Sequence, residues 1–487
     1  MSKLAKFSII SFGAGFTLMA FELVAARLLA PSLGTSMYVW TSVIGTMIAA
    51  LALGYWLGGR LADARHHTSD IAWLLLLSGL AITVTLALTA LILELVTRNI
   101  GDPRLQGVVA ALLLFAPTSL VLGMISPYLV KQALKSLDNS GSTVATLGAL
   151  NSLGGITGTF ATGFVLFDFV GSRTTLIVLT ILVIALSWLL VPKQDWIRRV
   201  AATVGIIILL GMYLPQNANA DIVVQLDTST PHYDIRDINY HGILSRGILM
   251  GPYGLQSGVS KDSPDDLLFT YTKNLARVTA AAPSHQHILI LGGGGYTLPE
   301  YLGRLYSSST VDVVEIDPKL EQIATKYLDY EALPNVRSFG TDARRFVAQA
   351  NPEQYDIVIV DVYSDYSVPF SLTTVEYAAE LSRIVKPSGN VLVNVIGNTK
   401  TCRPYLAAIH QSYTSALRHS KYLPSSHPDP QIYQNFIGIY SRQALDWTAN
   451  VNGVIEPDLS NGTRLTDDFA PTEKLMQQCL NSAMRRR

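Results

Sequence analysis

The chain has 487 residues, of which 49% are hydrophobic and 15% charged, and its formal net charge is zero. That length exceeds one ordinary domain, and the charge balance excludes a globally basic nucleic-acid-binding protein and an acidic disordered tail. The zero net charge is the sum of two opposite values. Residues 1–215 contain 13 basic and 8 acidic residues, whereas residues 216–487 contain 23 basic and 28 acidic residues. We therefore predict a transmembrane bundle over residues 1–215, a polar linker over residues 216–220 and a soluble domain over residues 221–487.

Apolar runs of about 20 residues, long enough to cross a bilayer, recur along the first part. They cover Phe7–Ala30, Tyr38–Gly58, Ile71–Val96, Gly107–Val130, Val144–Phe167, Thr174–Val191 and Val200–Leu214. A cleaved signal peptide cannot account for so many runs. The pattern predicts a multi-pass α-helical protein of the cell (inner) membrane, with about seven spans and the lipid bilayer as a partner. The fifth run is rich in small residues, which favour close packing of helices.

Basic residues are unevenly divided between the two sides that seven spans would define. One side would hold nine, namely Lys3, Lys6, Arg60, Arg65, Lys131, Lys135, Lys193, Arg198 and Arg199. The other would hold Arg98, Arg104 and Arg173. Because Lys and Arg are enriched in cytosolic loops, an odd number of spans puts the N-terminus in the cytosol and the soluble domain outside. An even number puts the soluble domain in the cytosol, so the sequence leaves its side of the membrane open.

The cysteine and histidine residues do not indicate a disulfide framework or a metal centre. The two cysteines, Cys402 and Cys479, are too few for a disulfide framework and are predicted to be ordinary thiols. No group of residues has the spacing of metal ligands, since the doublet His66 and His67 lies in a polar loop. We therefore predict no metal.

The second part alternates strand and helix patterns. Five strands are predicted at His287–Leu291, Val311–Ile316, Val336–Phe339, Asp356–Val362 and Asn390–Ile396. Their nearly continuous Val/Ile runs are typical of strands buried on both faces, and helical crossovers between them indicate a doubly wound parallel sheet. A hairpin of Tyr233–Asn239 and Ile243–Met250 precedes them. The predicted fold is an α/β Rossmann-like (class I methyltransferase-like) domain with a small N-terminal antiparallel β-sheet.

Candidate ligand-binding residues follow the first three of these strands, at the edge where such sheets bind ligands. Gly292, Gly293 and Gly294 would allow a ligand to approach the backbone, although a glycine cluster alone can simply mark a tight turn. Glu315 ends the next strand, where an acid can accept both ribose hydroxyls. Asp342 follows the third strand and could accept a hydrogen bond from an adenine amino group. Together these residues predict an adenosyl ligand, and their order does not separate a dinucleotide from S-adenosylmethionine.

The fourth strand favours a sulfonium donor, because it ends in Asp361. A carboxylate beside a bound sulfonium could attract an amine and take its proton. The alternative is a carboxylate that caps or fixes the following loop. That loop contains Tyr363 and Asp365 and is polar and aromatic, as expected of a segment that gates a site and contacts the substrate.

At these residues the soluble part, roughly Tyr233 to Glu473, resembles the spermidine synthase family of polyamine aminopropyltransferases. The similar segments are Leu291–Gly294, Val314–Asp317, Gly340–Ala343 and Tyr355–Asp361. With the membrane part, the chain resembles the fused multi-pass branch of that family, to which Phe21–Leu23, Arg27–Pro31 and Leu465–Pro471 are similar.

The resemblance implies a role for each matching residue. Glu315 would hold the ribose, Asp342 with Ala343 the adenine, and Asp361 would act as general base. Further matches are a glutamine of the nucleoside pocket, Gln256, and a tyrosine of the amine pocket, Tyr271. The implied reaction moves an aminopropyl group from decarboxylated S-adenosylmethionine to a diamine such as putrescine, giving spermidine and methylthioadenosine. It needs no metal, and self-association into a homo-oligomer is implied as well.

Two positions depart from the family pattern. Gly295 replaces an aspartate that binds the aminopropyl ammonium, and Thr272–Lys273 replaces a His/Gln–Glu pair after the pocket tyrosine. Lys273 would repel a cationic polyamine if it faced the cleft. Asp467 and Asp468 could restore the lost negative charge or could be exposed turn carboxylates.

Two other functions therefore stay open. The first is an S-adenosylmethionine-dependent methyltransferase acting on a small or lipid-borne acceptor, since Gly295 lacks the acid that would disfavour a donor carboxylate. The second is a polyamine or nucleoside transporter or sensor. It is suggested by the charged pair Glu22 and Arg27 in the first span and by Gly58–Arg65, which resembles a loop of major facilitator transporters.

Overall fold

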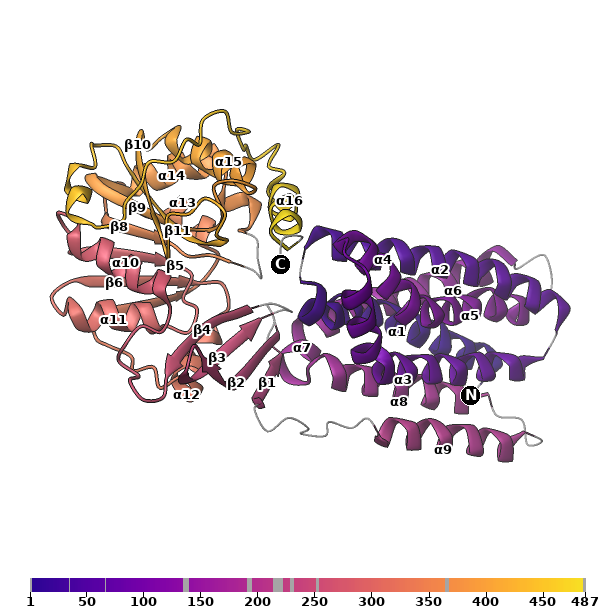
Figure 1. Cartoon of the computed structure of the whole chain (residues 1–487). Coiled ribbons are helices and arrows are strands. Elements are labelled where there is room, and N and C mark those ends of the chain that lie inside the picture. Colours follow the sequence, from indigo (N-terminus) through magenta and orange to yellow (C-terminus); the bar gives the residue numbers. More distant parts are fainter. Residues whose placement is uncertain are drawn as a thin grey trace. The chain divides into compact units, whose positions relative to one another are not determined.

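The computed structural model describes residues 2–34, 36–65, 67–134, 140–190, 195–212, 222–227, 232–250, 254–363 and 368–484. The chain divides into two compact units (Figure 1). Unit 1 comprises Met1–Ala220 with Leu226–His232, and unit 2 comprises Asp221–Gln225 with Tyr233–Arg487. The predicted linker, residues 216–220, lies outside the described residues.

Unit 1 is a bundle of helices. In chain order they are α1 (Lys3–Leu33), α2 (Met37–Ala64), α3 (Thr68–Asn99), α4 (Pro103–Leu114), α5 (Ala116–Ala133), α6 (Ser140–Ala161), a π-helical turn (Thr162–Leu166), α7 (Phe167–Phe169), α8 (Ser172–Trp188) and α9 (Trp196–Met212). By length and composition, α1, α2 and α3 could each cross a membrane. The pair α4 and α5, bent by 51° at its break, makes a fourth span if counted as one, and α8 is a shorter apolar helix. The number seven stays a prediction.

Close packing within unit 1 depends on small residues, as predicted for the fifth apolar run. A Cβ atom at Gly154 of α6 would lie 1.9 Å from the carbonyl oxygen of Phe12 in α1. At Gly158, one turn further on, it would lie 2.4 Å from the carbonyl oxygen of Phe16. Since real Cβ atoms do not approach so closely, any larger residue would force the two helices apart.

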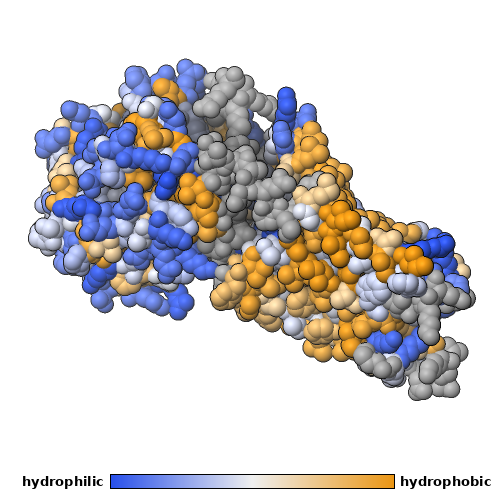
Figure 2. All heavy atoms as spheres, turned by 90° about the horizontal axis from the view of Figure 1, so that it is seen from below, coloured by the Kyte–Doolittle hydropathy of each residue, from blue (hydrophilic) through white to orange (hydrophobic). Residues whose placement is uncertain are grey.

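The outer surface of unit 1 is apolar. Figure 2 shows hydrophobic residues over most of the visible face of this unit, whereas hydrophilic residues predominate on unit 2. Large side chains at least half exposed on α2, α3 and α4 include Leu53, Trp56, Leu91, Leu95 and Leu112. Soluble proteins rarely expose apolar patches of this extent, so the surface is of the kind that lipid covers.

Unit 2 contains two sheets. The first has four strands in the order β1-β2-β3-β4: β1 (Ile222–Asp227), β2 (His232–Tyr240), β3 (Ile243–Met250) and β4 (Gly254–Ser260). Strands β2 and β3 pair antiparallel from Tyr240 and Ile243 outward, which is the predicted hairpin.

The second sheet has seven strands in the order β10-β11-β9-β8-β5-β6-β7. They are β5 (His287–Leu291), β6 (Thr310–Glu315), β7 (Val336–Gly340), β8 (Tyr355–Val360), β9 (Val385–Gly397), β10 (His419–Pro424) and β11 (Gln434–Ser441). Strands β5 to β9 pair in parallel, and each of the five predicted strands overlaps one of them. The predicted parallel sheet is thus confirmed for these five strands, and two strands that were not predicted extend it at one edge, where β11 pairs antiparallel with β9 and β10. These two strands carry Tyr, Gln, Asn and Gly among their apolar residues, and this hid the strand pattern.

Helices follow the strands of the large sheet in the alternation expected of a doubly wound fold. They are α10 (Thr270–Ala281), α11 (Thr297–Leu305), α12 (Leu320–Tyr327), α13 (Ala343–Gln349), α14 (Val375–Ile384), α15 (Arg403–Thr414) and α16 (Thr472–Met484), with short 3₁₀ turns at Phe370–Leu372 and Asp446–Asn450. The central strands are fully covered, since Ile288–Leu291 and Ile357–Val360 are each at most 1% exposed. The carboxyl ends of β5, β6 and β8 are thereby fixed at one edge of a rigid core.

The two cysteines form a disulfide, which corrects the prediction of ordinary thiols. Cys402 lies just before α15 and Cys479 within α16, and both are buried. Packing of α16 against α15 brings their Cα atoms to 4.4 Å although 77 residues separate them. The sequence could not reveal this pairing because it depends on where the last helix docks.

Loss of this disulfide is expected to destabilise unit 2 by about 2–4 kcal/mol, because the open chain gains conformational entropy when unfolded. The measurement is urea unfolding of the detergent-solubilised full chain, followed by near-ultraviolet circular dichroism with and without reductant. The double variant Cys402→Ala/Cys479→Ala should show the lowered stability and no response to reductant. Equal midpoints for the oxidised and reduced wild type would contradict the prediction.

Candidate functional site

The site is organised by the close approach of the chain after β5 to the chain after β8. Gly292 follows β5 with a φ of 99°, and a Cβ atom there would lie 2.1 Å from the carbonyl oxygen of Asp361. The N–H of Asp361 in turn donates to the carbonyl oxygen of Leu291 at 2.9 Å. Only glycine fits both the left-handed backbone and this contact. The predicted glycine loop and the predicted base therefore lie side by side.

Glu315, at the end of β6, holds the glycine loop. Its Oε2 accepts the N–H of Gly293 at 2.8 Å, and its Oε1 accepts the N–H of Asp317 at 2.9 Å. The residue is only 8% exposed, and burial raises the pKa of its carboxyl while these hydrogen bonds act in the opposite direction. Each carboxylate oxygen can accept a further hydrogen bond, so the group could still receive a ribose hydroxyl.

Strand β4 contributes Gln256 and Ser257 beside this loop. The pairing of β4 with β3 shifts register between Ile248 and Leu249, so Gln256 stands at a β-bulge, a device common next to binding sites. A Cβ atom at Gly295 would lie 2.5 Å from Ser257 Oγ and 2.7 Å from a methyl carbon of Leu328. A side chain at position 295 would therefore require Ser257 and Leu328 to shift. Ser257 was not predicted, and no sequence motif marks it.

Asp342 has a structural role at its predicted position. Its Oδ1 accepts the N–H of Arg345 at 2.9 Å, which caps the N-terminus of α13. The side chain is exposed, whereas that of Ala343 is buried. The cap fixes the carboxylate in the loop after β7 without using its full acceptor capacity.

Asp361 is held by two side chains. Asn394 Nδ2 on β9 donates to its Oδ1 at 2.7 Å, and the hydroxyl of Tyr271 on α10 donates to the same carboxylate. Burial raises the pKa of Asp361, and these two hydrogen bonds act against that rise. Burial likewise raises the pKa of Tyr271, and the neighbouring carboxylate adds to the effect. Two residues predicted separately, as base and as amine contact, are thus brought together.

Further side chains that the sequence analysis missed support this pair. Asn435 Nδ2 on β11 donates to Asn394 Oδ1 at 2.9 Å, which fixes the orientation of the amide. The sequence did contain a signal for Asn394, because this residue interrupts the apolar run of β9 and a buried polar side chain needs a hydrogen-bond partner.

Tyr363 is bound to the backbone of β9. Its hydroxyl donates to the carbonyl oxygen of Asn394 at 3.0 Å and accepts the N–H of Ile396 at 2.9 Å. The ring therefore anchors the start of the loop after β8 next to Asp361. Asp365 lies outside the described residues.

Lys273, the residue that departs from the family pattern, does not share a face with Tyr271. It is exposed and lines a surface pocket with Asp266, Arg277 and Tyr301, whereas Tyr271 reaches Asp361. Two residues apart on a helix point about 200° away from each other. The charge of Lys273 is therefore directed away from the Asp361 carboxylate.

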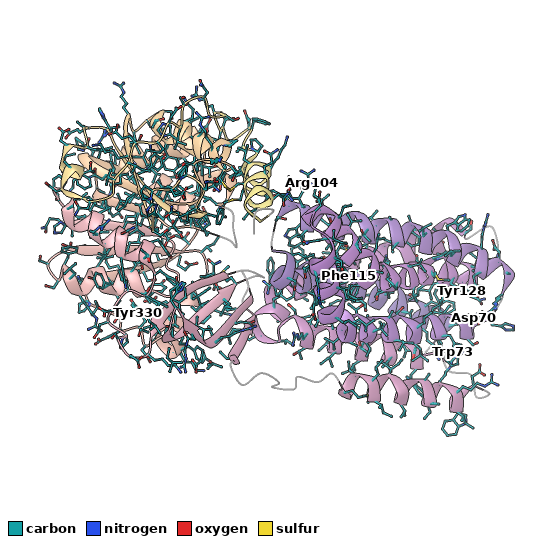
Figure 3. The ribbon with its side chains drawn as sticks, viewed as in Figure 1. Asp70, Trp73, Arg104, Phe115, Tyr128 and Tyr330 are labelled. Atoms are coloured by element: carbon teal, nitrogen blue, oxygen red, sulfur yellow. A yellow bond between two sulfur atoms is a disulfide. The ribbon has the colours of Figure 1, made fainter. Side chains whose placement is uncertain are left out.

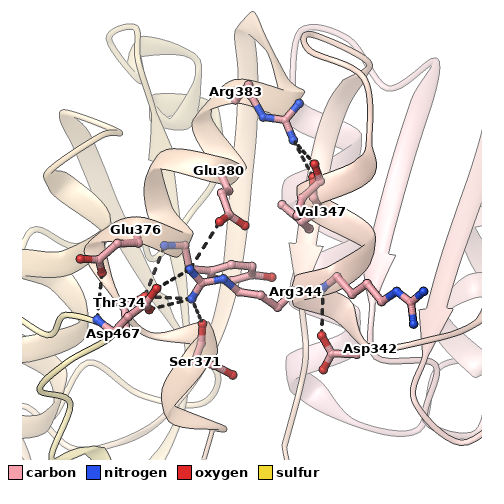
Figure 4. A network of polar contacts seen from close by, with 12 residues as sticks. Asp342, Arg344, Val347, Ser371, Thr374, Glu376, Glu380, Arg383 and Asp467 are labelled. Carbon is pink, nitrogen blue, oxygen red and sulfur yellow. Dashed lines mark hydrogen bonds and ion pairs between the residues drawn. The ribbon is translucent and has the colours of Figure 1, made fainter.

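Asp467 does not supply the missing negative charge at the glycine loop. Its carboxylate is bound by the guanidinium of Arg344 at 2.8 Å and by the hydroxyl of Thr374 at 2.7 Å (Figure 4). Arg344 also lies 3.4 Å from Glu380. This network ties α13 and α14 to the segment before α16 and is structural.

The arrangement offers hydrogen-bond acceptors at Glu315 and Asp342 and a carboxylate at Asp361 that could accept a proton. Within the described ranges, no three His, Cys, Asp or Glu side chains gather as metal ligands would. The chemistry that these residues offer is that of a carboxylate base beside a glycine loop.

Residues 268–446 match the family described as spermine/spermidine synthase domain. A polyamine aminopropyltransferase of Vibrio vulnificus is 31% identical over 136 residues, which are 28% of this chain and 46% of that protein. Putrescine N-methyltransferase 2 of Nicotiana attenuata is 31% identical over 129 residues, 25% of this chain and 34% of that protein. The crystal structure of a probable spermidine synthase from Corynebacterium glutamicum is 21% identical, with 47% of this chain and 81% of that one covered and a TM-score of 0.39. The chain thus spans less than half the length of these two sequence relatives.

Asp361→Asn is expected to raise the free energy of unfolding of unit 2 at neutral pH. Because the folded-state pKa of Asp361 is raised above 3.8, the ionised carboxylate destabilises the fold, and this cost disappears as the pH falls below 3.8, where the group is protonated in both states. The measurement is urea unfolding at several pH values.

The control is Asp356→Asn. Burial alone would raise the pKa of Asp356, but hydrogen bonds from Lys386 and Ser284 lower it, so this variant should be destabilised at neutral pH. A loss of stability in Asp361→Asn equal to that of the control would contradict the expected sign.

Proposed function

We propose that unit 2, which carries a spermine/spermidine synthase domain over residues 268–446, is a polyamine aminopropyltransferase. It would transfer an aminopropyl group from decarboxylated S-adenosylmethionine to a primary amine of a diamine such as putrescine. The products would be spermidine and methylthioadenosine. Unit 1 would place the enzyme in the cell (inner) membrane as a multi-pass protein, and a homo-oligomer is part of the proposal.

The main support for this proposal is the position of the Asp361 carboxylate. The carboxylate of Asp361 is held by Tyr271 and Asn394 immediately beside Gly292, where the glycine loop would face the donor. A base in that place can reach an amine that attacks a sulfonium bound along the loop.

The transfer balances as a single displacement. The amine nitrogen forms a bond to the aminopropyl carbon attached to sulfur, and the carbon–sulfur bond breaks with its electron pair moving to sulfur. The sulfonium becomes the neutral thioether of methylthioadenosine. Asp361 takes the proton that the nitrogen loses, and its raised pKa makes it a stronger base than an ordinary aspartate.

The donor would be held on the other side of the glycine loop. Glu315 would accept the ribose hydroxyls while it continues to bind the N–H of Gly293. Gln256 at the bulge of β4 and Asp342 with Ala343 after β7 would contact the nucleoside. Tyr271 and Tyr363 border Asp361 and would shape the amine side, with Asp365 as a further proposed contact.

A second function is favoured by Gly295. An aspartate at this position would bind an ammonium group and repel a donor carboxylate, and here glycine is fixed by Ser257 and Leu328. Intact S-adenosylmethionine would then be accepted and a methyl group transferred to a small or lipid-borne amine. The similarity to a putrescine N-methyltransferase fits this alternative.

A donor assay separates the two functions. Purified full chain in detergent is expected to release methylthioadenosine from decarboxylated S-adenosylmethionine with putrescine or a related diamine, measured by mass spectrometry. Release of S-adenosylhomocysteine from the intact donor would instead establish methyl transfer. Absence of either product across a panel of diamines, other small amines and lipid-borne amines would reject both.

Asp361→Asn is expected to lower the turnover number by about 10²–10⁴-fold, because the amide cannot take the proton from the amine. Donor affinity, measured by calorimetry, should change little since Glu315 and Gln256 are untouched. The matched control is Asp446→Asn, the same substitution at an exposed carboxylate, which should leave turnover unchanged. A large loss of donor affinity with unchanged turnover would show that Asp361 binds the donor and is not the base.

A further inference from the structure

The two ends of unit 1 differ in charge, and the contacts within the unit identify which segments share an end. The hydroxyl of Tyr128, near the end of α5, donates to Asp70 at the start of α3 at 2.7 Å and to the carbonyl oxygen of Arg65 after α2 at 3.2 Å. Lys131 pairs with Asp63 at 2.6 Å. The end of α2, the start of α3 and the end of α5 therefore lie together, and we call this the basic end.

The start of α9 lies at the basic end as well. The guanidinium of Arg199 donates to the carbonyl oxygens of Ser69, at the start of α3, at 3.2 Å and of Leu190, after α8, at 3.4 Å. Its Cζ lies 5.8 Å from the centre of the Trp73 ring. Asp70, Trp73 and Tyr128 mark this end in Figure 3, and the N-terminus with Lys3 is at the same end in Figure 1.

The opposite end carries few basic residues. Arg104, at the start of α4, donates to the hydroxyl of Tyr38, at the start of α2, at 3.2 Å, and it lies far from Tyr128 in Figure 3. Arg98 and Arg173 belong to the same end, because α3 finishes and α8 begins there. Among the described residues, Lys3, Lys6, Arg60, Arg65, Lys131, Arg198 and Arg199 thus belong to segments at the basic end, and Arg98, Arg104 and Arg173 to segments at the other.

Helix α9 runs from the basic end toward the opposite one. Arg199 of α9 contacts Ser69 of α3, and Ile206, seven residues later in α9, packs with Leu76, seven residues later in α3. The two helices are therefore parallel. The contact of Thr203 with Trp188 and the packing of Ile206 with Ile184 show that α9 runs antiparallel to α8. With 17 residues, α9 is at the lower limit of length for a membrane span.

The disulfide of unit 2 is an independent observation. Disulfides form and persist in oxidising compartments and are rare in the cytosol. Cys402 and Cys479 are the two cysteines of the chain, and both sulfurs are used in one buried bond.

From the basic end, the direction of α9 and the disulfide, we infer that unit 2 is held on the non-cytosolic side of the membrane. The basic end faces the cytosol, since Lys and Arg are retained there. The chain leaves unit 1 along α9 at the opposite side, where the pair Cys402–Cys479 can oxidise. This inference is independent of the reaction that unit 2 catalyses.

Reporter fusions to the full chain test the inference. Green fluorescent protein, which matures in the cytosol, should be dark when fused after Arg487 and bright when fused before Met1, the matched control. Alkaline phosphatase, which needs an oxidising compartment, should be active after Arg487. A fluorescent C-terminal fusion together with an inactive phosphatase fusion would overturn the inference.

The state of the cysteines is a second readout that needs no variant. Membranes are denatured in the presence of a maleimide–polyethylene glycol reagent, with and without prior reduction. The expected result is no mass shift before reduction and two additions after it. Two additions without reduction would show free thiols and overturn the oxidising location.

Discussion

The geometry of the candidate site depends on one steric constraint, the contact of Gly292 with the carbonyl oxygen of Asp361. Because β5 and β8 are adjacent parallel strands, the chain segments that leave them meet at the same edge of the sheet. The absence of a side chain at Gly292 lets the two segments touch. The glycine loop and the Asp361 carboxylate are thereby placed side by side, and the fully buried core strands keep them there.

The buried carboxylate of Glu315 and the half-buried carboxylate of Asp361 are stabilised in different ways. Glu315 receives backbone N–H groups, whose positions are fixed by the fold, and these hydrogen bonds hold the glycine loop. Asp361 receives the side chains of Asn394 and Tyr271, which come from two other elements. Burial raises the pKa of both groups. The first carboxylate is held by main-chain groups, and the second by side chains of two other elements.

The sequence allowed the parallel strands, the glycine loop, Glu315 and Asp361 to be predicted, because buried strands and strand ends leave local patterns. The disulfide, the Asn435–Asn394 hydrogen bond and the pairing of Asp467 with Arg344 could not be predicted in this way. Each joins residues that are distant along the chain, and each depends on the docking of a late element. The role of Asp342 is a different matter, because an aspartate at a strand end can bind a ligand or can cap the next helix, and the sequence does not separate the two roles.

The crowding at Gly295 has a consequence for how such a site changes over evolutionary time. A side chain at position 295 would collide with Ser257 on β4 and with Leu328 after α12, which belong to separate elements. An acidic residue there would therefore require both side chains to change rotamer or to be replaced by smaller ones, and smaller neighbours leave a gap while glycine is still present. The packing around Gly295 thus couples the residue at this position to Ser257 and Leu328, so changes at the three positions are expected to depend on one another.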